Sequence, residues 1–126
     1  MVVLDTAALL YWTIDRPSLS RPAEIAIATA QEIVISSISI WEIALKAKSG
    51  KLAIPLPIRE YVELLRQAHK IQITPVTEEI WLKNVELAWA HKDPADRTIV
   101  ATATLLGYPL LSPDRHIQAF YTATVW

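Results

Sequence analysis

Short apolar runs alternate with longer helical stretches along this chain, and this alternation limits the possible folds more than any other feature. The runs lie at Val2–Leu4, Ile33–Ser36, Ile71–Thr74 and Leu110–Leu111, with a further edge strand expected at 123–126. Short, β-branched apolar runs are typical of strands that are buried on both faces. The sequence therefore predicts an α/β fold with a short central parallel sheet of four to five strands, flanked by helices on both faces.

The intervals between these runs are predicted to be helical, and several of their ends carry helix-start or helix-stop residues. Thr6 is expected to cap a helix after the first strand, and Pro94 is expected to open another. Gly50 and Gly107, the only two glycines, are expected to stop helices. The predicted helices cover about 7–12, 20–31, 37–50, 57–69, 77–91 and 94–107. Since the chain has no glycine-rich linker and no internal repeat, residues 1–126 are expected to form a single domain.

The composition supports a globular domain and excludes several kinds of site. With 52% hydrophobic and 20% charged residues, a chain of 126 residues can bury a sizeable core. The absence of cysteine excludes disulfide scaffolds, thiolate zinc sites and cysteine nucleophiles, and it is compatible with a cytoplasmic location. The start MVVLDT lacks the basic and long apolar regions of a signal peptide. No apolar run approaches the ~18 residues that a membrane-spanning helix needs.

The charge balance gives no reason to expect that the whole molecule attracts nucleic acid. The net charge is −1, and the chain has no lysine-rich block. A polyanion would have to be held by a local cationic patch or through a bound metal. Five tryptophans in so apolar a small chain suggest a protein partner or self-association.

Four acidic residues fall at or just beyond the expected ends of strands, whereas most of the others lie on expected solvent-facing helix surfaces. Asp5 directly follows the first strand, and Asp114 follows the strand at 110–111. Glu42 lies near the start of the helix after the second strand, and Asp96 lies in the first turn of the 94–107 helix. Ligands of open parallel sheets bind outside the carboxyl ends of the strands. The four carboxylates are therefore expected to converge.

Several of these positions also have a simpler structural explanation. Glu42 could pair with Lys46 one turn later on a helix surface. Asp114 ends a Ser-Pro-Asp turn. Asp93 suits the N-cap of the 94–107 helix, and both Asp93 and Asp96 suit the positive end of the helix dipole. Since one capping acid is enough, the helix start does not account for Asp96.

Carboxylates that are brought together repel one another and raise each other's pKa unless a cation neutralises them. A small set of oxygen ligands suits Mg²⁺ or Mn²⁺, which retain water molecules and often take phosphate oxygens as further ligands. An ion held in this way can activate water and stabilise the charge that develops on a phosphodiester. The acids therefore predict hydrolysis of a phosphoester.

The chain resembles PIN-domain proteins, and specifically the VapC-like toxin ribonucleases of type II toxin–antitoxin pairs. Four blocks carry the resemblance, in family order and spacing: VVLDTAALL, SSISIWEIALKAKSGKL, HKDPADRTIVATA and LLSPDRHI. Asp5, Glu42, Asp96 and Asp114 match the acidic metal-centre positions of that family. The resemblance implies that Asp5 and Asp96 are the most direct metal ligands, and that Glu42 and Asp114 complete the site or orient water. Asp93 belongs to the D-P-x-D-R form of the third block.

Other residues beside the acids fit the family pattern less uniformly. Thr6 and Ser112 match the small hydroxyl residues that often accompany the acids. Many relatives carry histidine where this chain has Ala7, so no histidine chemistry is assigned there. Pro113 stands before Asp114 and bears on how that acid points.

By resemblance, the expected activity is Mg²⁺- or Mn²⁺-dependent endonucleolytic cleavage of RNA by a metal-activated water, in a cytoplasmic toxin. The same resemblance implies a cognate antitoxin, a homodimer, and contact with DNA only indirectly through the antitoxin. Cations beside the acid blocks could hold RNA phosphates or could simply pair with the acids. These cations are Lys46, Lys48, Lys51, Arg97 and Arg115.

Other functions fit the sequence less well. An aspartyl-nucleophile phosphatase would need an acid at position 7, which is Ala7, and a receiver module would need an acid next to Asp5. The three histidines have no helical metal spacing, so no zinc site is expected. Trp81 and Trp89 are expected on one face of the 77–91 helix, where a second subunit could dock. The alternative that stays open is a non-catalytic PIN-like module that binds RNA or protein.

Overall fold

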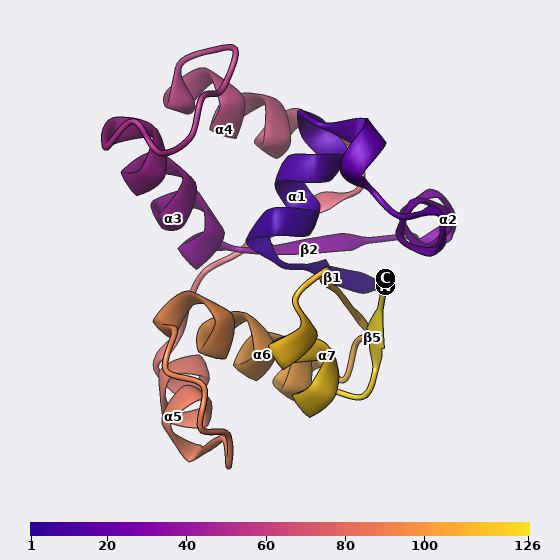
Figure 1. The fold of residues 1–126 in the computed structure, drawn as a ribbon, viewed down its shortest axis with the longest axis vertical. Coiled ribbons are helices and arrows are strands. Elements are labelled where there is room, and N and C mark those ends of the chain that lie inside the picture. Colours follow the sequence, from indigo (N-terminus) through magenta and orange to yellow (C-terminus); the bar gives the residue numbers. More distant parts are fainter.

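A computed structural model describes residues 1–126 and shows a five-stranded parallel sheet in the order β3-β2-β1-β4-β5 (Figure 1). Every neighbouring pair of strands is parallel. The strands are β1 (Val2–Leu4), β2 (Ile33–Ser36), β3 (Ile71–Thr74), β4 (Leu110–Leu111) and β5 (Thr124–Val125). The predicted fold class is therefore confirmed, and the first four strands have the predicted bounds.

Seven α-helices and one short 3₁₀ helix connect and cover the strands. They are α1 (Thr6–Thr13), η1 (Arg16–Ser18), α2 (Arg21–Thr29), α3 (Ser37–Lys48), α4 (Ile58–Gln67), α5 (Glu78–Glu86), α6 (Pro94–Leu106) and α7 (Arg115–Phe120). Figure 1 shows α1, α3 and α4 on one side of the sheet and α5, α6 and α7 on the other. No helix is long and apolar enough to cross a membrane.

The central strands β1, β2 and β4 are buried on both faces because each face contacts its own hydrophobic core. Val2, Leu4, Ile33 and Ile35 belong to a core that includes residues of α1, α2, α3 and α4. The intervening residues of the same strands, such as Val3, belong to a second core that is formed with α6 and α7. Successive strand side chains point to opposite faces, so a three- or four-residue strand serves both cores.

Helix starts gather at the carboxyl edge of the sheet, where polar residues end the strands. Asp5, rather than Thr6, is the N-cap of α1, and its carboxylate accepts a hydrogen bond from the backbone N–H of Ala8 at 2.8 Å. Thr6 is instead the first helical residue. At the far end of α6, Gly107 adopts φ 70°, a left-handed conformation that favours glycine and ends the helix.

The helix predicted at 77–91 was wrong in length, because α5 ends at Glu86. The guanidinium of Arg97 on α6 donates hydrogen bonds to four backbone carbonyls in and beyond the last turn of α5. These carbonyls belong to Asn84, Leu87, Trp89 and His91, at 2.5, 3.1, 2.5 and 3.0 Å. Because Arg97 supplies hydrogen-bond donors to these four carbonyls, the backbone does not need further helical turns to satisfy them. Residues 87–92 therefore form an irregular segment. Trp89 therefore does not share a helix with Trp81.

Candidate metal-dependent nuclease site

The candidate site lies where the strand order reverses. The chain runs outward from β1 to β2 and β3 and then returns to place β4 on the other side of β1. The carboxyl ends of β1 and β4 thus border the crevice at a topological switch point, which is the usual ligand site of such sheets.

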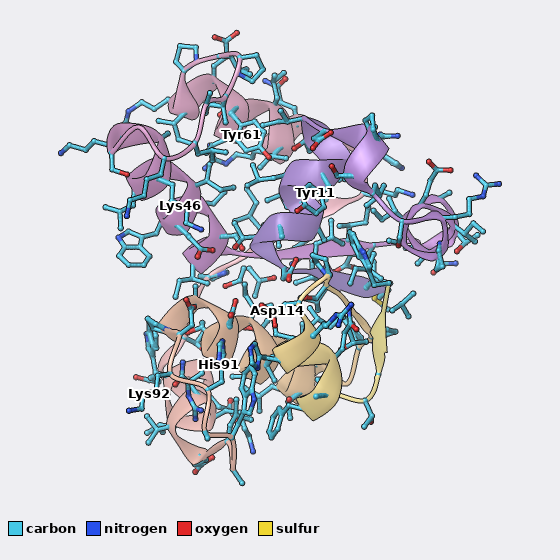
Figure 2. The ribbon with its side chains drawn as sticks, viewed as in Figure 1. Tyr11, Lys46, Tyr61, His91, Lys92 and Asp114 are labelled. Carbon is cyan, nitrogen blue, oxygen red and sulfur yellow. The ribbon has the colours of Figure 1, made fainter.

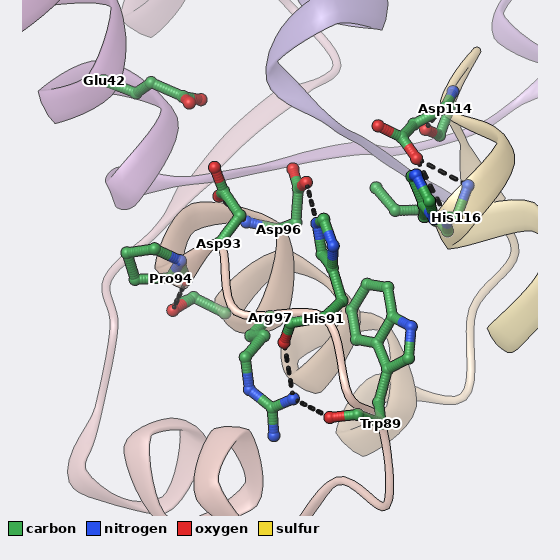
Figure 3. Close-up of polar contacts among 12 residues, drawn as sticks. Glu42, Trp89, His91, Asp93, Pro94, Asp96, Arg97, Asp114 and His116 are labelled. Carbon is green, nitrogen blue, oxygen red and sulfur yellow. Dashed lines mark hydrogen bonds and ion pairs between the residues drawn. The ribbon is translucent and has the colours of Figure 1, made fainter.

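A cleft of about 520 Å³ at this edge brings the four predicted acids together. The cleft is lined by all four acids, which come from distant parts of the sequence: Asp5, Glu42, Asp96 and Asp114. Figure 3 shows Glu42 extending from α3 toward Asp93 and Asp96, with Asp114 across the opening beside α7. Thr6, Lys46 and Asp93 also contribute to the lining. The convergence that the sheet topology predicted is present in the structure.

Asp5 is the most deeply placed of these acids, with only 4% of its surface exposed. Burial raises its pKa from 3.8 to about 7, and the nearby charges of Asp96 and Asp114 add to the increase. Hydrogen bonds from Ser112 and from the backbone N–H of Ala8 oppose it. A carboxylate that is this poorly solvated is stabilised by any cation that enters the cleft.

Asp96 lies in the first turn of α6 and is half-buried. Its Oδ2 lies 2.8 Å from Nε2 of His91. Desolvation raises the pKa of Asp96, the hydrogen bond to His91 lowers it, and the charges of Asp93 and Asp114 raise it further. The cleft thus holds two carboxyl groups, Asp5 and Asp96, whose ionisation is opposed by burial and by the negative charges of nearby carboxylates.

Asp93 and Asp114 combine a capping role with their place in the cleft. Asp93 Oδ1 accepts a hydrogen bond from the backbone N–H of Asp96 at 2.9 Å, as the helix start predicted. Asp114 Oδ1 accepts from the backbone N–H groups of His116 and Ile117 at 2.7 and 3.1 Å, and so caps α7. Capping occupies only one oxygen of each carboxylate, which leaves the other oxygen available.

Glu42 fits both of the interpretations that the sequence left open. It forms an ion pair with Lys46 at 3.5 Å, and the glutamate side chain is only 17% exposed while the lysine is 49% exposed. Both side chains also line the cleft. The pair therefore lies at the cleft wall, where an entering cation could compete with Lys46 for the carboxylate.

Comparison with known proteins agrees with this geometry. Residues 2–122 match the PIN domain family. The chain belongs to the PIN-domain family. It is 30% identical to Ribonuclease VapC22 of Mycobacterium tuberculosis, in an alignment that covers 99% of this chain and 98% of that protein. The predicted resemblance is confirmed.

Solved structures share the PIN fold with this chain. A toxin–antitoxin complex from Klebsiella pneumoniae aligns with a TM-score of 0.70 at 23% identity, over 100% of this chain and 97% of the other. FitAcB from Neisseria gonorrhoeae aligns with a TM-score of 0.64 at 20% identity, covering 98% and 93%. VapC20 of M. tuberculosis, a sarcin-ricin loop cleaving toxin, aligns with a TM-score of 0.64 at 17% identity, covering 94% of each chain.

The hydroxyl residues of the PIN-domain chain act beside the acids in different ways. Thr6 donates a hydrogen bond to Ser39 at 2.9 Å and so ties the start of α1 to α3. Ser112 is fully buried beneath the cleft, accepts a hydrogen bond from the backbone N–H of Asp114 at 3.1 Å, and lowers the pKa of Asp5. Ser112 therefore connects the carboxyl ends of β1 and β4 at the base of the site.

The candidate RNA-contacting cations separate into two groups. Lys46, Lys48, Lys51 and Arg115 are exposed, and Lys46, which extends from α3 (Figure 2), lines the cleft itself. Arg97 is different because the backbone carbonyls of residues 84–91 already surround its guanidinium (Figure 3). These contacts make Arg97 a structural residue that holds the 87–92 segment, and we do not include it among the proposed phosphate contacts.

Aromatic side chains lie beside Asp96, and the sequence did not predict this feature. The ring of His91 lies 4.7 Å from that of Trp89 and 5.4 Å from that of His116. His91 and His116 are far apart in sequence, and their spacing gave no sign of contact. Only the placement of α7 against the 87–92 segment brings them together.

The carboxylates of the PIN domain suit a hydrated hard cation better than a fully dehydrated one. No group of three or more His, Cys, Asp or Glu side chains stands in an arrangement that would hold a metal ion directly. The donor set nevertheless consists of carboxylate oxygens, two of which belong to groups whose pKa is raised by burial. Mg²⁺ keeps several waters and uses one or two carboxylates plus substrate phosphates. The residues fit such an ion.

Proposed function

We propose that this chain is the toxin of a type II toxin–antitoxin pair and acts as a Mg²⁺- or Mn²⁺-dependent endoribonuclease, with residues 1–126 forming one PIN-like domain. The observation that carries the proposal is the convergence of Asp5, Glu42, Asp96 and Asp114 in one cleft, where burial opposes the ionisation of two of them. Similarity to a ribonuclease along nearly the whole chain supports it.

In this proposal the acids divide the work according to their positions. Asp5 and Asp96, the two carboxyl groups whose pKa is raised, hold the cation. Glu42 and Asp114 face the same space from α3 and from the start of α7, and they orient water and accept its proton. Asp93 caps α6 and adds negative charge at the cleft wall. The bound ion would activate water and neutralise charge on the scissile phosphate.

Binding of RNA is proposed to use the exposed cations around the acidic cleft. Lys46 lines the cleft, and Lys48 and Arg115 are exposed on α3 and α7. A net charge of −1 gives no long-range attraction, so these local contacts and the cation must hold the substrate. Thr6 and Ser112 support the acids and do not contact RNA.

The proposed protein partners are a second copy of the chain and a cognate antitoxin. Large apolar side chains are exposed on α3 and α5: Trp41 55%, Leu45 51%, Trp81 47%, Leu82 64% and Val85 79%. Trp41 and Trp81 line one apolar groove of about 500 Å³. An exposed patch of this kind is typical of an interface, and we assign it to the homodimer.

The antitoxin proposal draws on the structural relatives, which include a toxin–antitoxin complex and a FitAB complex with a DNA fragment. We propose that this chain meets DNA only through its antitoxin, because its own net charge is −1 and its cleft is acidic. A cytoplasmic location follows from the proposed RNA substrate.

The experiment that tests the function compares RNA cleavage by four proteins purified free of antitoxin. These are the wild type, Asp5→Asn, Asp96→Asn and the control Asp15→Asn, whose exposed carboxylate precedes η1 and does not line the cleft. Total RNA is incubated with Mn²⁺ or Mg²⁺, or with EDTA. We expect the wild type and Asp15→Asn to cut RNA only with the divalent ion, and both site variants to lose at least a hundredfold in rate.

Expression in cells gives a second test of the same proposal. The wild type should arrest growth, and Asp96→Asn should relieve the arrest while the protein stays folded by circular dichroism. The proposed ribonuclease activity would be contradicted if the wild type cut no RNA with either ion and if cells expressing Asp96→Asn grew like cells expressing the wild type. If the purified wild type binds RNA in the cleavage assay without cutting it, the chain is a non-catalytic RNA-binding module.

A further inference from the structure

Four aromatic side chains form a continuous row from α7 to the edge of the acidic cleft. Phe120 stacks on Trp89 with ring centroids 4.8 Å apart and planes within 10°. Trp89 contacts His91 at 4.7 Å, and His91 stacks on His116 at 5.4 Å with planes within 13°. Both ends of the row belong to α7, and the middle belongs to the 87–92 segment. Figure 3 shows Trp89, His91 and His116 beside one another next to Asp96.

The row fixes the imidazole of His91 in one orientation. Its ring contacts a ring on either side in the row, and such contacts restrict side-chain rotation. The backbone at this point is also held, because Arg97 donates hydrogen bonds to the carbonyls of Trp89 and His91 at 2.5 and 3.0 Å. Ring and backbone are thus fixed independently, from α7 and from α6.

In this orientation Nε2 of His91 lies 2.8 Å from Oδ2 of Asp96, which is a short hydrogen-bond distance. Both side chains are about 23% exposed, so water competes only weakly with this bond. No other side chain forms a hydrogen bond with the carboxylate of Asp96. The single bond to His91 therefore decides how the carboxylate is rotated and leaves Oδ1 without a protein partner.

We propose that His91 is a positioning residue that holds Oδ2 of Asp96 and thereby presents Oδ1 to a divalent cation in the cleft. The inference rests on the proposed function, because it assigns the role of His91 through Asp96. Groups that hydrogen-bond to metal ligands orient those ligands, and their loss commonly costs about 10- to 100-fold in metal affinity or activity. The aromatic row gives this hydrogen bond a rigid support, which a histidine on a free loop would lack.

The test measures Mn²⁺ affinity by electron paramagnetic resonance, in the absence of RNA, for the wild type and four variants. His91→Ala removes the hydrogen bond, whereas His91→Gln keeps an N–H donor near the position of Nε2. His116→Ala removes one end of the row, and His69→Ala is the control because His69 is exposed on the 68–70 turn. We expect the dissociation constant for Mn²⁺ to rise about tenfold or more in His91→Ala. His91→Gln should recover most of the loss, His116→Ala should show a smaller loss, and His69→Ala none.

Cleavage of a mixed-sequence RNA then separates positioning from substrate contact. In His91→Ala, kcat at a fixed low Mn²⁺ concentration should fall about tenfold or more and recover as Mn²⁺ is raised. The KM for RNA at saturating Mn²⁺ should stay within twofold of the wild type, because His91 acts through Asp96 and does not bind RNA.

The outcomes distinguish this inference from the proposed function. If His91→Ala binds Mn²⁺ as tightly as the wild type, or if His91→Gln is as weak as His91→Ala, the positioning role is overturned even though the wild type cuts RNA. If the wild type cuts no RNA but Mn²⁺ affinity falls as expected, the positioning role stands and the ribonuclease proposal fails. Should His91→Ala unfold, His91→Gln and His116→Ala decide, because equal affinity in His116→Ala and the wild type then overturns the role of the row.

Discussion

Replacing Asp5 with asparagine should make the protein more stable while it removes activity. Asp5 is 4% exposed, and its pKa rises from 3.8 to about 7 chiefly because burial disfavours the charge. This difference corresponds to about 4 kcal/mol that the folded protein loses when the buried carboxyl ionises. Asparagine carries no charge, and its side-chain oxygen can still accept the hydrogen bond from Ala8 that caps α1.

The sign and the pH window follow from the direction of the pKa change. Because the folded protein binds a proton at Asp5 more tightly than the unfolded chain does, this group lowers the free energy of unfolding as the pH rises from about 4 to about 7. Above that range the cost is constant, and below about pH 4 it vanishes. Allowing for imperfect hydrogen bonding of the new amide, Asp5→Asn should gain roughly 2–4 kcal/mol at pH 8 and nothing below pH 4.

Urea unfolding at several pH values between 3.5 and 8.5 measures this difference, with EDTA present and with Asp15→Asn as the matched control. A gain of 1 kcal/mol corresponds to roughly 4 °C in Tm for a chain of this size. Addition of Mn²⁺ should then stabilise the wild type by about 2.7 kcal/mol at a concentration a hundred times its Kd, and should stabilise Asp5→Asn far less. If Asp5→Asn is no more stable than the wild type at pH 8, or if its gain is the same at pH 4, the assignment of a desolvated, destabilising carboxyl is refuted.

Three further predictions concern other parts of the molecule. Arg97→Met should lower the free energy of unfolding, measured by urea unfolding, by about 3 kcal/mol or more, because several backbone carbonyls lose their hydrogen-bond donor. Unchanged stability together with weaker RNA binding would instead identify Arg97 as a phosphate contact. Lys48→Ala and Arg115→Ala should leave Tm unchanged and raise the KM for RNA, with a shallower dependence on salt in filter binding. Val85→Lys, at a side chain that is 79% exposed, should convert a dimer to a monomer in analytical ultracentrifugation without loss of Tm, whereas an unchanged mass would place the interface elsewhere.

The sequence predicted the centre of the sheet well because β1, β2 and β4 are short, largely apolar and bounded by clear stops. Burial of both faces leaves a strand such as Val2–Leu4 no polar position, so its limits are visible in composition alone. The convergence of Asp5 with Asp114 followed from the same reasoning, since parallel strands share one carboxyl edge. The assignment of these acids to a metal stays a prediction that the experiments above test.

Features that depend on distant side chains could not be predicted. The end of α5 at Glu86 is set by hydrogen bonds from the guanidinium of Arg97 to backbone carbonyls. The helical periodicity of the sequence does not reveal these long-range hydrogen bonds. The six-residue helix α7 is too short to form without tertiary contacts, and it depends on the buried side chain of Ile117. The contact between His91 and His116 exists only because α7 packs beside the 87–92 segment.

The place of β1 in the middle of the sheet has a consequence for the order in which the chain becomes active. Asp5 donates its backbone N–H to the carbonyl of Leu111 at 3.1 Å, and β1 pairs with β4 through Val3–Leu110 and Leu4–Leu111. This pairing closes a loop that spans most of the chain, whereas the contacts of Arg97 join residues only 6 to 13 positions apart. We expect the 84–97 unit to form early and the carboxylate cluster to form last. A nascent chain on the ribosome would then carry no complete acidic cleft until residues 110–114 had emerged and folded onto the strand that was made first.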